Sequence, residues 1–274
     1  MNGAASRLHE VPLTQDEIDR ILRLCGTRAL LIGGQALGVW AIRLGVRPPR
    51  SLGPTVSSDI DFVGTGTVAS ALCKALGGNW KTQQGTLDDA GSQVAKLYRK
   101  VGDDGVQQID FLSGVVGLDA TAVRNRAVEL TLEDGTVLKV MHPLDVLESR
   151  LRNLAAIPSK RNLVGVVQAR FAVKVAKAFV VDHIAEGRDS KILRQALKRI
   201  ETVALDRELC AVAFAYDIDV LRAIPLDRVP LPRYARDQFP RMLARLATRR
   251  EKHEKLLTRR AALRMKRSRV RSKP

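Results

Sequence analysis

Two aspartates, Asp59 and Asp61, stand two residues apart in the segment Ser58-Asp59-Ile60-Asp61-Phe62. Successive side chains of a β-strand alternate between its faces, so both carboxylates project from one face while Ile60 and Phe62 point into a core. The Cα atoms of the two aspartates then lie roughly 6.5–7 Å apart. Carboxylates that converge at this spacing can hold a pair of divalent ions about 3.5–4 Å apart. We expect the ion to be Mg²⁺, which combines a few carboxylates with water and phosphate oxygens.

A pair of glycines, Gly33 and Gly34, precedes the aspartates and follows the short apolar run Ala29–Ile32. This order predicts a strand, a tight turn and the beginning of a helix. The glycines would leave backbone N–H groups unshielded at the helix N-terminus, where phosphate oxygens are favoured. Phosphate-binding N–H groups beside metal-binding carboxylates indicate nucleotidyl transfer.

A third carboxylate, Asp110, lies in the segment Val106–Leu112. Ile109, Phe111 and Leu112 indicate a strand, on which Asp110 would complete the site as a base or as a ligand of a second metal ion. The polar neighbours Gln107 and Gln108 also permit the alternative that Asp110 is a surface residue near the end of a strand.

The order of these features resembles the nucleotidyltransferase superfamily that includes DNA polymerase β. Within it, the chain is most similar to the AbiEii-type nucleotidyltransferases, the toxins of type IV toxin–antitoxin systems. The resemblance covers roughly residues 28–151, with two departures. Glycine stands at position 34, where many members carry serine, and 24 residues separate Gly34 from Asp59, more than in the most compact members. The resemblance implies an NTP substrate, a tRNA acceptor and a cognate antitoxin.

The resemblance also implies a cation that faces the triphosphate, where it would stabilise charge on the leaving pyrophosphate. AbiEii-type proteins supply it from an Arg-x-x-Lys-Asp-like segment of their helical half. The nearest match is a segment that holds Arg150, Arg152, Lys160 and Arg161 and has Asn162 in place of the aspartate. Lys160 is the functional candidate among these basic residues. Lys96 is a second candidate for binding the nucleotide, and each of these cations could instead be a solvated surface charge.

The net charge of +17 is concentrated near the C-terminus of the 274-residue chain. Residues 241–274 contain 14 Lys and Arg against 2 Asp and Glu, a balance of +12, which leaves +5 for the other 240 residues. Such a block is typical of a polyanion-binding segment, or of a solvated, frayed helix. We predict no membrane span and no signal peptide, and three dispersed cysteines indicate the reducing cytoplasm.

Periodicity and turn residues predict an α/β (α+β) architecture with two domains. Residues 1–142 would form a nucleotidyltransferase-like mixed sheet with flanking helices, and residues 143–274 a helical domain that ends in a basic helix or tail. Two hairpins are expected in the sheet, 92–101 with 106–111 and 127–132 with 136–140. Helices are expected at 14–24, 35–44, 68–76, 163–186, 190–203, 205–216 and 241–267, with a further helix beginning at residue 144.

The sequence therefore predicts a Mg²⁺-dependent nucleotidyltransferase that transfers an NMP from an NTP to an acceptor hydroxyl, with RNA favoured as the acceptor by the basic C-terminal segment. In this prediction Asp59, Asp61 and Asp110 hold the metal, Gly33, Gly34 and Lys96 bind the nucleotide, and Lys160 stabilises the leaving group. The toxin role comes from the resemblance. Two alternatives remain: transfer to a small molecule or a protein side chain, and a catalytically silent fold that binds RNA or a partner.

Overall fold

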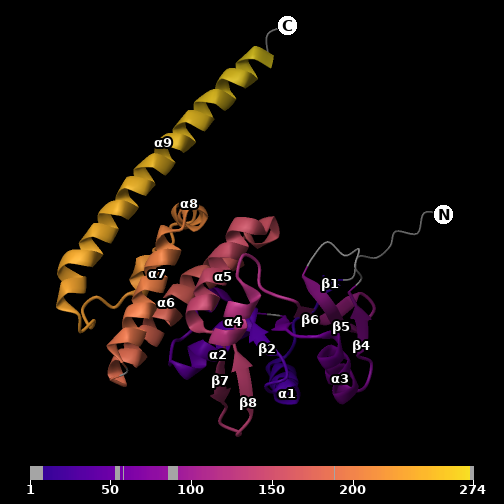
Figure 1. Cartoon of the computed structure of the whole chain (residues 1–274). Coiled ribbons are helices and arrows are strands. Elements are labelled where there is room, and N and C mark those ends of the chain that lie inside the picture. The colour runs from indigo at the N-terminus through magenta and orange to yellow at the C-terminus, as the bar shows by residue number, and fades with distance from the viewer. Residues whose placement is uncertain (1–8, 53–55, 58, 86–91, 188, 272–274) are drawn as a thin grey trace. The chain divides into compact units, whose positions relative to one another are not determined.

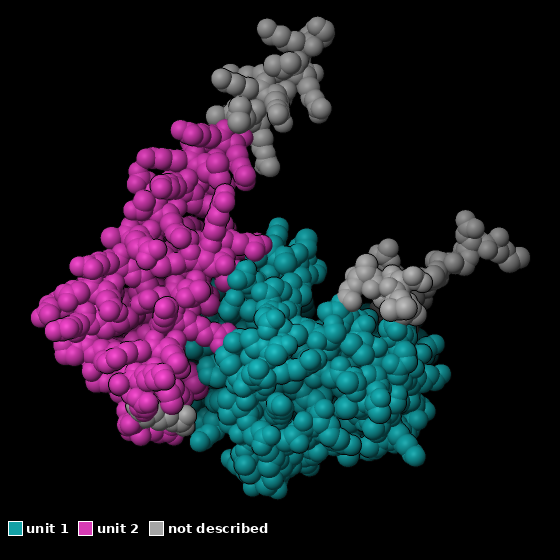
Figure 2. All heavy atoms as spheres, viewed as in Figure 1, with its two compact units in different colours: residues 1–178 teal, residues 179–274 magenta. Residues whose placement is uncertain are grey.

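The computed structural model of the chain describes residues 9–52, 56–57, 59–85, 92–187 and 189–271, with side chains as far as residue 261. The chain forms two compact units, residues 1–178 and 179–274 (Figure 2). The first contains the sheet and its flanking helices, and the second is helical (Figure 1). The predicted fold class is confirmed. The predicted domain boundary at residue 142 falls directly before helix α5, which belongs to the first unit.

The described strands of the first unit form one mixed sheet in the order β4-β5-β6-β3-β2-β8-β7, and β1 pairs with β6 outside that path. Both predicted hairpins are present, β5 with β6 and β7 with β8. Between them, β3 runs parallel to β6 and antiparallel to β2. The strands are β1 His9–Glu10, β2 Leu30–Ile32, β3 Ile60–Val63, β4 Lys81–Gln84, β5 Gln93–Val101, β6 Gly105–Leu112, β7 Val128–Thr131 and β8 Val137–Val140.

The side chains on one face of the central strands form the core of the first unit. Ile60 and Phe62 of β3 and Ile109 and Phe111 of β6 are fully buried, as their alternation with polar residues predicts. The rings of Phe62 and Phe111 stack with centroids 5.3 Å apart. The intervening residues, Asp61 and Asp110 among them, therefore project from the opposite face.

Several helices of the first unit begin at a residue whose side chain caps the helix. Thr14 and Glu17 form the predicted capping box of α1, and Thr65 and Asp119 cap α3 and α4. Pro143 occupies the first turn of α5, a position where its missing N–H costs nothing. The helices of this unit are α1 Gln15–Cys25, α2 Gly33–Arg43, α3 Gly66–Leu76, α4 Ala120–Arg126 and α5 Pro143–Ala156, with short 3₁₀ turns at Arg50–Leu52 and Pro158–Lys160.

Helix α6, Leu163–Ala185, begins in the first unit and ends in the second. The second unit continues with α7 Ser190–Leu205, α8 Arg207–Ala215, a 3₁₀ turn Val220–Ala223, a π-helical turn Tyr234–Gln238 and the long helix α9 Phe239–Arg271. The expected helices of this region are all present. Within the described part of the chain, no helix combines the length and the apolar composition that a membrane crossing requires.

Candidate active site

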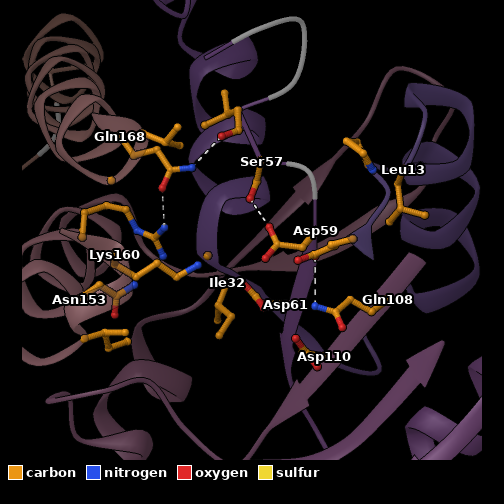
Figure 3. A pocket seen from close by; sticks show the side chains of 18 of the residues that line it. Leu13, Ile32, Ser57, Asp59, Asp61, Gln108, Asp110, Asn153, Lys160 and Gln168 are labelled. Atoms are coloured by element: carbon orange, nitrogen blue, oxygen red, sulfur yellow. Dashed lines mark hydrogen bonds between the residues drawn. The ribbon is translucent and has the colours of Figure 1, made fainter. Parts of the chain in front are cut away.

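The three predicted aspartates meet at the middle of the sheet. Asp61 lies directly opposite Asp110 in the parallel β3–β6 pair, and opposite Ile32 at the end of β2. Asp59 precedes β3 by one residue and has the same alternation phase as Asp61. All three carboxylates line one cavity of about 980 Å³ in the first unit (Figure 3). The structure therefore brings together residues that are up to 51 positions apart in the sequence.

The two predicted glycines lie where backbone and side chains approach closely. Gly33 lines the cavity with a left-handed φ of 73°, and a Cβ atom at this position would overlap the carboxylate of Asp61. A Cβ atom at Gly34 would overlap the side chain of Ser57. Both residues begin α2, which has no side-chain cap at its N-terminus. The N-terminus of α2 therefore lies beside the carboxylate of Asp61, and no side chain of its N-cap residue covers its first N–H groups.

Two glutamines hold the segment that leads into Asp59. Gln35 of α2 donates from Nε2 to the backbone carbonyl of Ser57 (2.7 Å), and Gln168 of α6 donates to that of Val56 (2.8 Å). The Ser57 hydroxyl in turn donates to Oδ1 of Asp59. These bonds fix the orientation of one carboxylate from two different helices, which Figure 3 shows for Gln168, Ser57 and Asp59.

Burial and repulsion from neighbouring carboxylates weaken the acidity of Asp61 and Asp110. The pKa of Asp61 rises to about 7, mainly because of burial and then because of the neighbouring charge of Asp59. Arg150 opposes this rise, and Asp110 adds to it. Burial also raises the pKa of Asp110, and Lys96 counteracts it. A set of carboxylates with raised pKa values in a cavity is a signature of a functional site.

The basic residues occupy different sides of the carboxylates. Lys96 of β5 pairs with Asp110 in the β5–β6 register, and its Nζ lies 3.8 Å from Oδ1. Lys160 is exposed and lines the cavity on the opposite side, with Asn153 and Gln168 (Figure 3). Lys96 itself is not among the residues that line the cavity. It therefore neutralises Asp110 from beside the cavity, whereas Lys160 faces the open space.

Arg150 is one of the basic residues in the segment that resembles the family's cation motif, and the sequence did not distinguish it from the others. It projects from α5 into the cavity, where its NH1 donates to Oε1 of Gln168 (3.2 Å) and its buried Nε has no hydrogen-bond partner among the described atoms. Burial lowers the pKa of its guanidinium, and the charges of Asp61 and Asp59 act against that decrease. A buried guanidinium N–H that remains unsatisfied suits an anionic ligand.

Sequence reasoning missed other polar residues of the cavity. Gln93 donates to Asp110 (2.6 Å), and Gln108 and Asn153 also line the cavity. The alternation of β5 and β6 could have revealed Gln93 and Gln108, since both belong to the strands of the predicted hairpin. Asn153 is three residues beyond Arg150 on α5, a spacing that places both on one helix face.

The donor set around Asp59, Asp61 and Asp110 fits a hard divalent cation. Its ligands would be carboxylate oxygens, which Mg²⁺ prefers, and a bound cation would relieve the repulsion that raises the pKa of Asp61. Among the residues that the structure describes, three metal-ligand groups lie within 4.8 Å of one another only at Asp182, His183 and Glu186 of the second unit. The wider spacing of the three aspartates leaves room for water or phosphate oxygens between them.

Comparisons with known proteins give distant structural likenesses. No family model and no curated protein matches the chain. The solved structure of JHP933 from Helicobacter pylori is similar to it with 13% sequence identity and a TM-score of 0.37, over 90% of this chain and 94% of that chain. Another H. pylori structure, named a "putative nucleotidyltransferase", is similar with 13% identity and a TM-score of 0.31, over 89% and 99%. The chemistry of the site thus rests on its own residues.

Proposed function

We propose that the chain is a metal-dependent nucleotidyltransferase that moves an NMP from an NTP to an acceptor hydroxyl. The observation that carries this proposal is the convergence of Asp59, Asp61 and Asp110 on one cavity, beside the glycine turn that begins α2. The acceptor oxygen would attack the α-phosphorus of the NTP in line. The bond from that phosphorus to the bridging oxygen would break, and pyrophosphate would leave.

The residues of the chain would mainly position groups and balance charge. The N–H groups of Gly33 and Gly34 would donate to the triphosphate. Asp110 would accept the proton of the acceptor hydroxyl, a role that its raised pKa favours. Asp59 and Asp61 would hold Mg²⁺, which supplies charge neutralisation on the phosphate oxygens when it is bound.

Arg150 and Lys160 would face the developing negative charge of the pyrophosphate. Arg150 is supported by its unsatisfied, buried Nε, and Lys160 by its position at the open side of the same cavity. Because the fork of Arg150 is already oriented by Gln168, little side-chain freedom would be lost when it binds a phosphate. Lys160 is exposed and would have to be ordered by the substrate.

RNA is the acceptor that the charge distribution favours, because residues 241–274 carry an excess of +12 that a small acceptor does not require. The resemblance to AbiEii-type toxins extends the proposal to the 3′ end of tRNA, to growth inhibition and to a cognate antitoxin as partner.

The test is a transfer assay with purified protein, Mg²⁺, total RNA and each labelled NTP in turn. Label should appear in an RNA band, and Asp61→Asn should abolish it. Asp103→Asn is the matched control, because Asp103 lies exposed at the β5–β6 turn and outside the cavity. It should leave the transfer unchanged.

Each other outcome of this assay has a defined meaning. Label on the protein alone would replace the RNA acceptor by a protein side chain. Transfer that persists in Asp61→Asn would refute the assignment of the site. If no NTP gives label on any acceptor, and Mg²⁺ with NTP does not raise the thermal stability of the protein, the nucleotidyltransferase activity itself would be refuted.

A further inference from the structure

A second cavity, of about 420 Å³, lies within the second unit between α8 and α9. Four of its eight lining residues are Arg, Lys or His, and none is acidic. Helix α8 contributes Arg207 and Phe214, and α9 contributes Arg249, Lys252, His253 and Leu256. We call this cavity the basic groove. Its α9 residues are separated by three, four and seven positions, so they form one helix face.

The basic groove is held in shape by contacts that leave its charges near the surface. Arg249 donates from NH1 to the backbone carbonyl of Leu205 at the end of α7. Arg250, the next residue, places its guanidinium 4.9 Å from the ring centroid of Phe214. The ring of His253 also lies beside Phe214, with centroids 5.8 Å apart. These contacts fix α9 against α8, while Arg207 and Lys252 remain exposed.

The positive charge extends along α9 beyond the groove. Arg241, Arg245, Arg259 and Arg260 are exposed, and Lys255 forms an i,i+4 ion pair with Glu251. A helix of 33 residues is about 50 Å long, and Figure 1 shows α9 continuing past α8 toward the C-terminus. Basic side chains that recur over such a length match a polymer with repeated negative charges better than a single phosphate.

We propose that the basic groove and the exposed basic side chains of α9 bind the sugar–phosphate backbone of RNA. Arginine dominates this surface, and its planar fork donates to two phosphate oxygens at once. Phe214 is the one Phe, Tyr or Trp among the described residues that line the groove, and it is already covered by Arg250 and flanked by the ring of His253. Base stacking therefore contributes little, and the binding is independent of base sequence. An acidic protein partner fits less well, because the centres of protein interfaces are depleted in charge.

This binding site is separate from the proposed transfer reaction and does not depend on it, because its residues lie in the other compact unit. The RNA held there could be the acceptor of the reaction, but the binding itself requires neither NTP nor metal. An experiment in EDTA without nucleotide therefore tests the groove alone. Asp61→Asn should bind RNA as tightly as the unchanged protein even if it has lost all transfer activity.

The experiment measures the fluorescence anisotropy of a labelled single-stranded RNA with the full-length protein at several salt concentrations. The test variant is Arg207→Glu with Lys252→Glu, two exposed groove residues whose reversal leaves the packing intact. The control is Lys74→Glu with Lys81→Glu, two exposed residues of α3 and β4 that change the net charge by the same amount. The groove variant should weaken binding at least tenfold and reduce the log–log salt slope by about 1.4, whereas the control should weaken it less than about twofold.

Equal weakening by both variants would overturn the proposal, because binding would then depend on net charge and not on the groove. No measurable RNA binding at low salt would overturn it as well. A third arm uses poly-glutamate of matched charge: if it binds as tightly as RNA and loses affinity in the groove variant, the ligand is an acidic polypeptide and the RNA assignment is wrong.

Discussion

Replacing Asp61 by asparagine should stabilise the metal-free protein at neutral and alkaline pH. Asparagine has nearly the size of a protonated aspartic acid, but it cannot ionise beside Asp59 and Asp110. The pKa of Asp61 is raised in the folded state to about 7, whereas the unfolded chain has the ordinary value of 3.8. The folded state therefore binds the proton more tightly, and stability falls as the pH increases from about 4 through about 7.

The size of the effect follows from this difference in pKa. Each pKa unit corresponds to about 1.4 kcal/mol, so ionising Asp61 in the folded protein costs about 4 kcal/mol above pH 8. At pH 5 the folded state is still protonated while the unfolded state is ionised, and the cost is about 1.7 kcal/mol. The advantage of Asp61→Asn should therefore grow by about 2.5 kcal/mol between pH 5 and pH 8.

Urea unfolding in excess EDTA, followed by tryptophan fluorescence, measures this change. Trp40 and Trp80 are the two tryptophans of the chain and both belong to the first unit, so the signal reports on the unit that contains Asp61. Asp103→Asn serves as the control, because this exposed carboxylate should change the free energy of unfolding by less than about 0.5 kcal/mol at either pH. Mg²⁺ should stabilise the unchanged protein more than Asp61→Asn, because it binds the ionised site.

The reasoning would be refuted by an advantage of Asp61→Asn that is the same at pH 5 and pH 8, since ionisation of Asp61 would then not be the cause. A variant that is less stable than the unchanged protein at pH 8 would show that Asp61 forms favourable contacts as an anion. Equal stabilisation of both proteins by Mg²⁺ would contradict the metal assignment and leave the pKa argument intact.

Four further substitutions separate the architecture of the first unit from the chemistry of the site. Gly33→Ala should lower the free energy of unfolding by about 1–2 kcal/mol, seen as a lower melting temperature, and should abolish transfer. The reason is that the left-handed backbone and the Asp61 carboxylate both exclude a Cβ atom. Unchanged stability would contradict the observed turn. Arg126→Met should lower the free energy of unfolding of the first unit by about 3 kcal/mol in urea. The substitution removes a guanidinium that donates two hydrogen bonds (2.8 and 3.0 Å) to the fully buried Asp145. A decrease in the free energy of unfolding below about 1 kcal/mol would count against this ion pair. Lys160→Ala should leave stability within about 0.5 kcal/mol and slow transfer. Arg150→Met should raise the pKa of Asp61 more than Lys160→Ala does, because the charge of Arg150 lowers that pKa more than the charge of Lys160. The pH profile of stability should therefore shift further to higher pH in Arg150→Met, and identical profiles for the two variants would refute the coupling of Arg150 to Asp61.

Local patterns were sufficient to predict most elements that position the site. The alternation around Asp59 and Asp61, the hairpin turn before Gly105 and the Thr14 capping box are properties of a few neighbouring residues, and the structure contains each of them. Short polar elements were missed. The strand β4, Lys81-Thr-Gln-Gln84, lies at the edge of the sheet and has no apolar alternation. It is stabilised by its pairing with one neighbouring strand, β5, which a local sequence pattern does not reveal. The two-residue strand β1 and the short helix α4 were missed as well.

The sequence by itself determined the chemistry that is available: paired carboxylates on a strand, glycines at a helix N-terminus, and a basic C-terminal segment. Only the tertiary structure decided which residues meet. The register of β3 against β6 places Asp61 opposite Asp110, and the packing of α5 and α6 brings Arg150 and Gln168 to the same cavity. Such pairings depend on contacts across about 50 to 110 residues, which no periodicity within a segment encodes. The raised pKa of Asp61 arises from that assembly, because burial and neighbouring charge exist only in the folded chain.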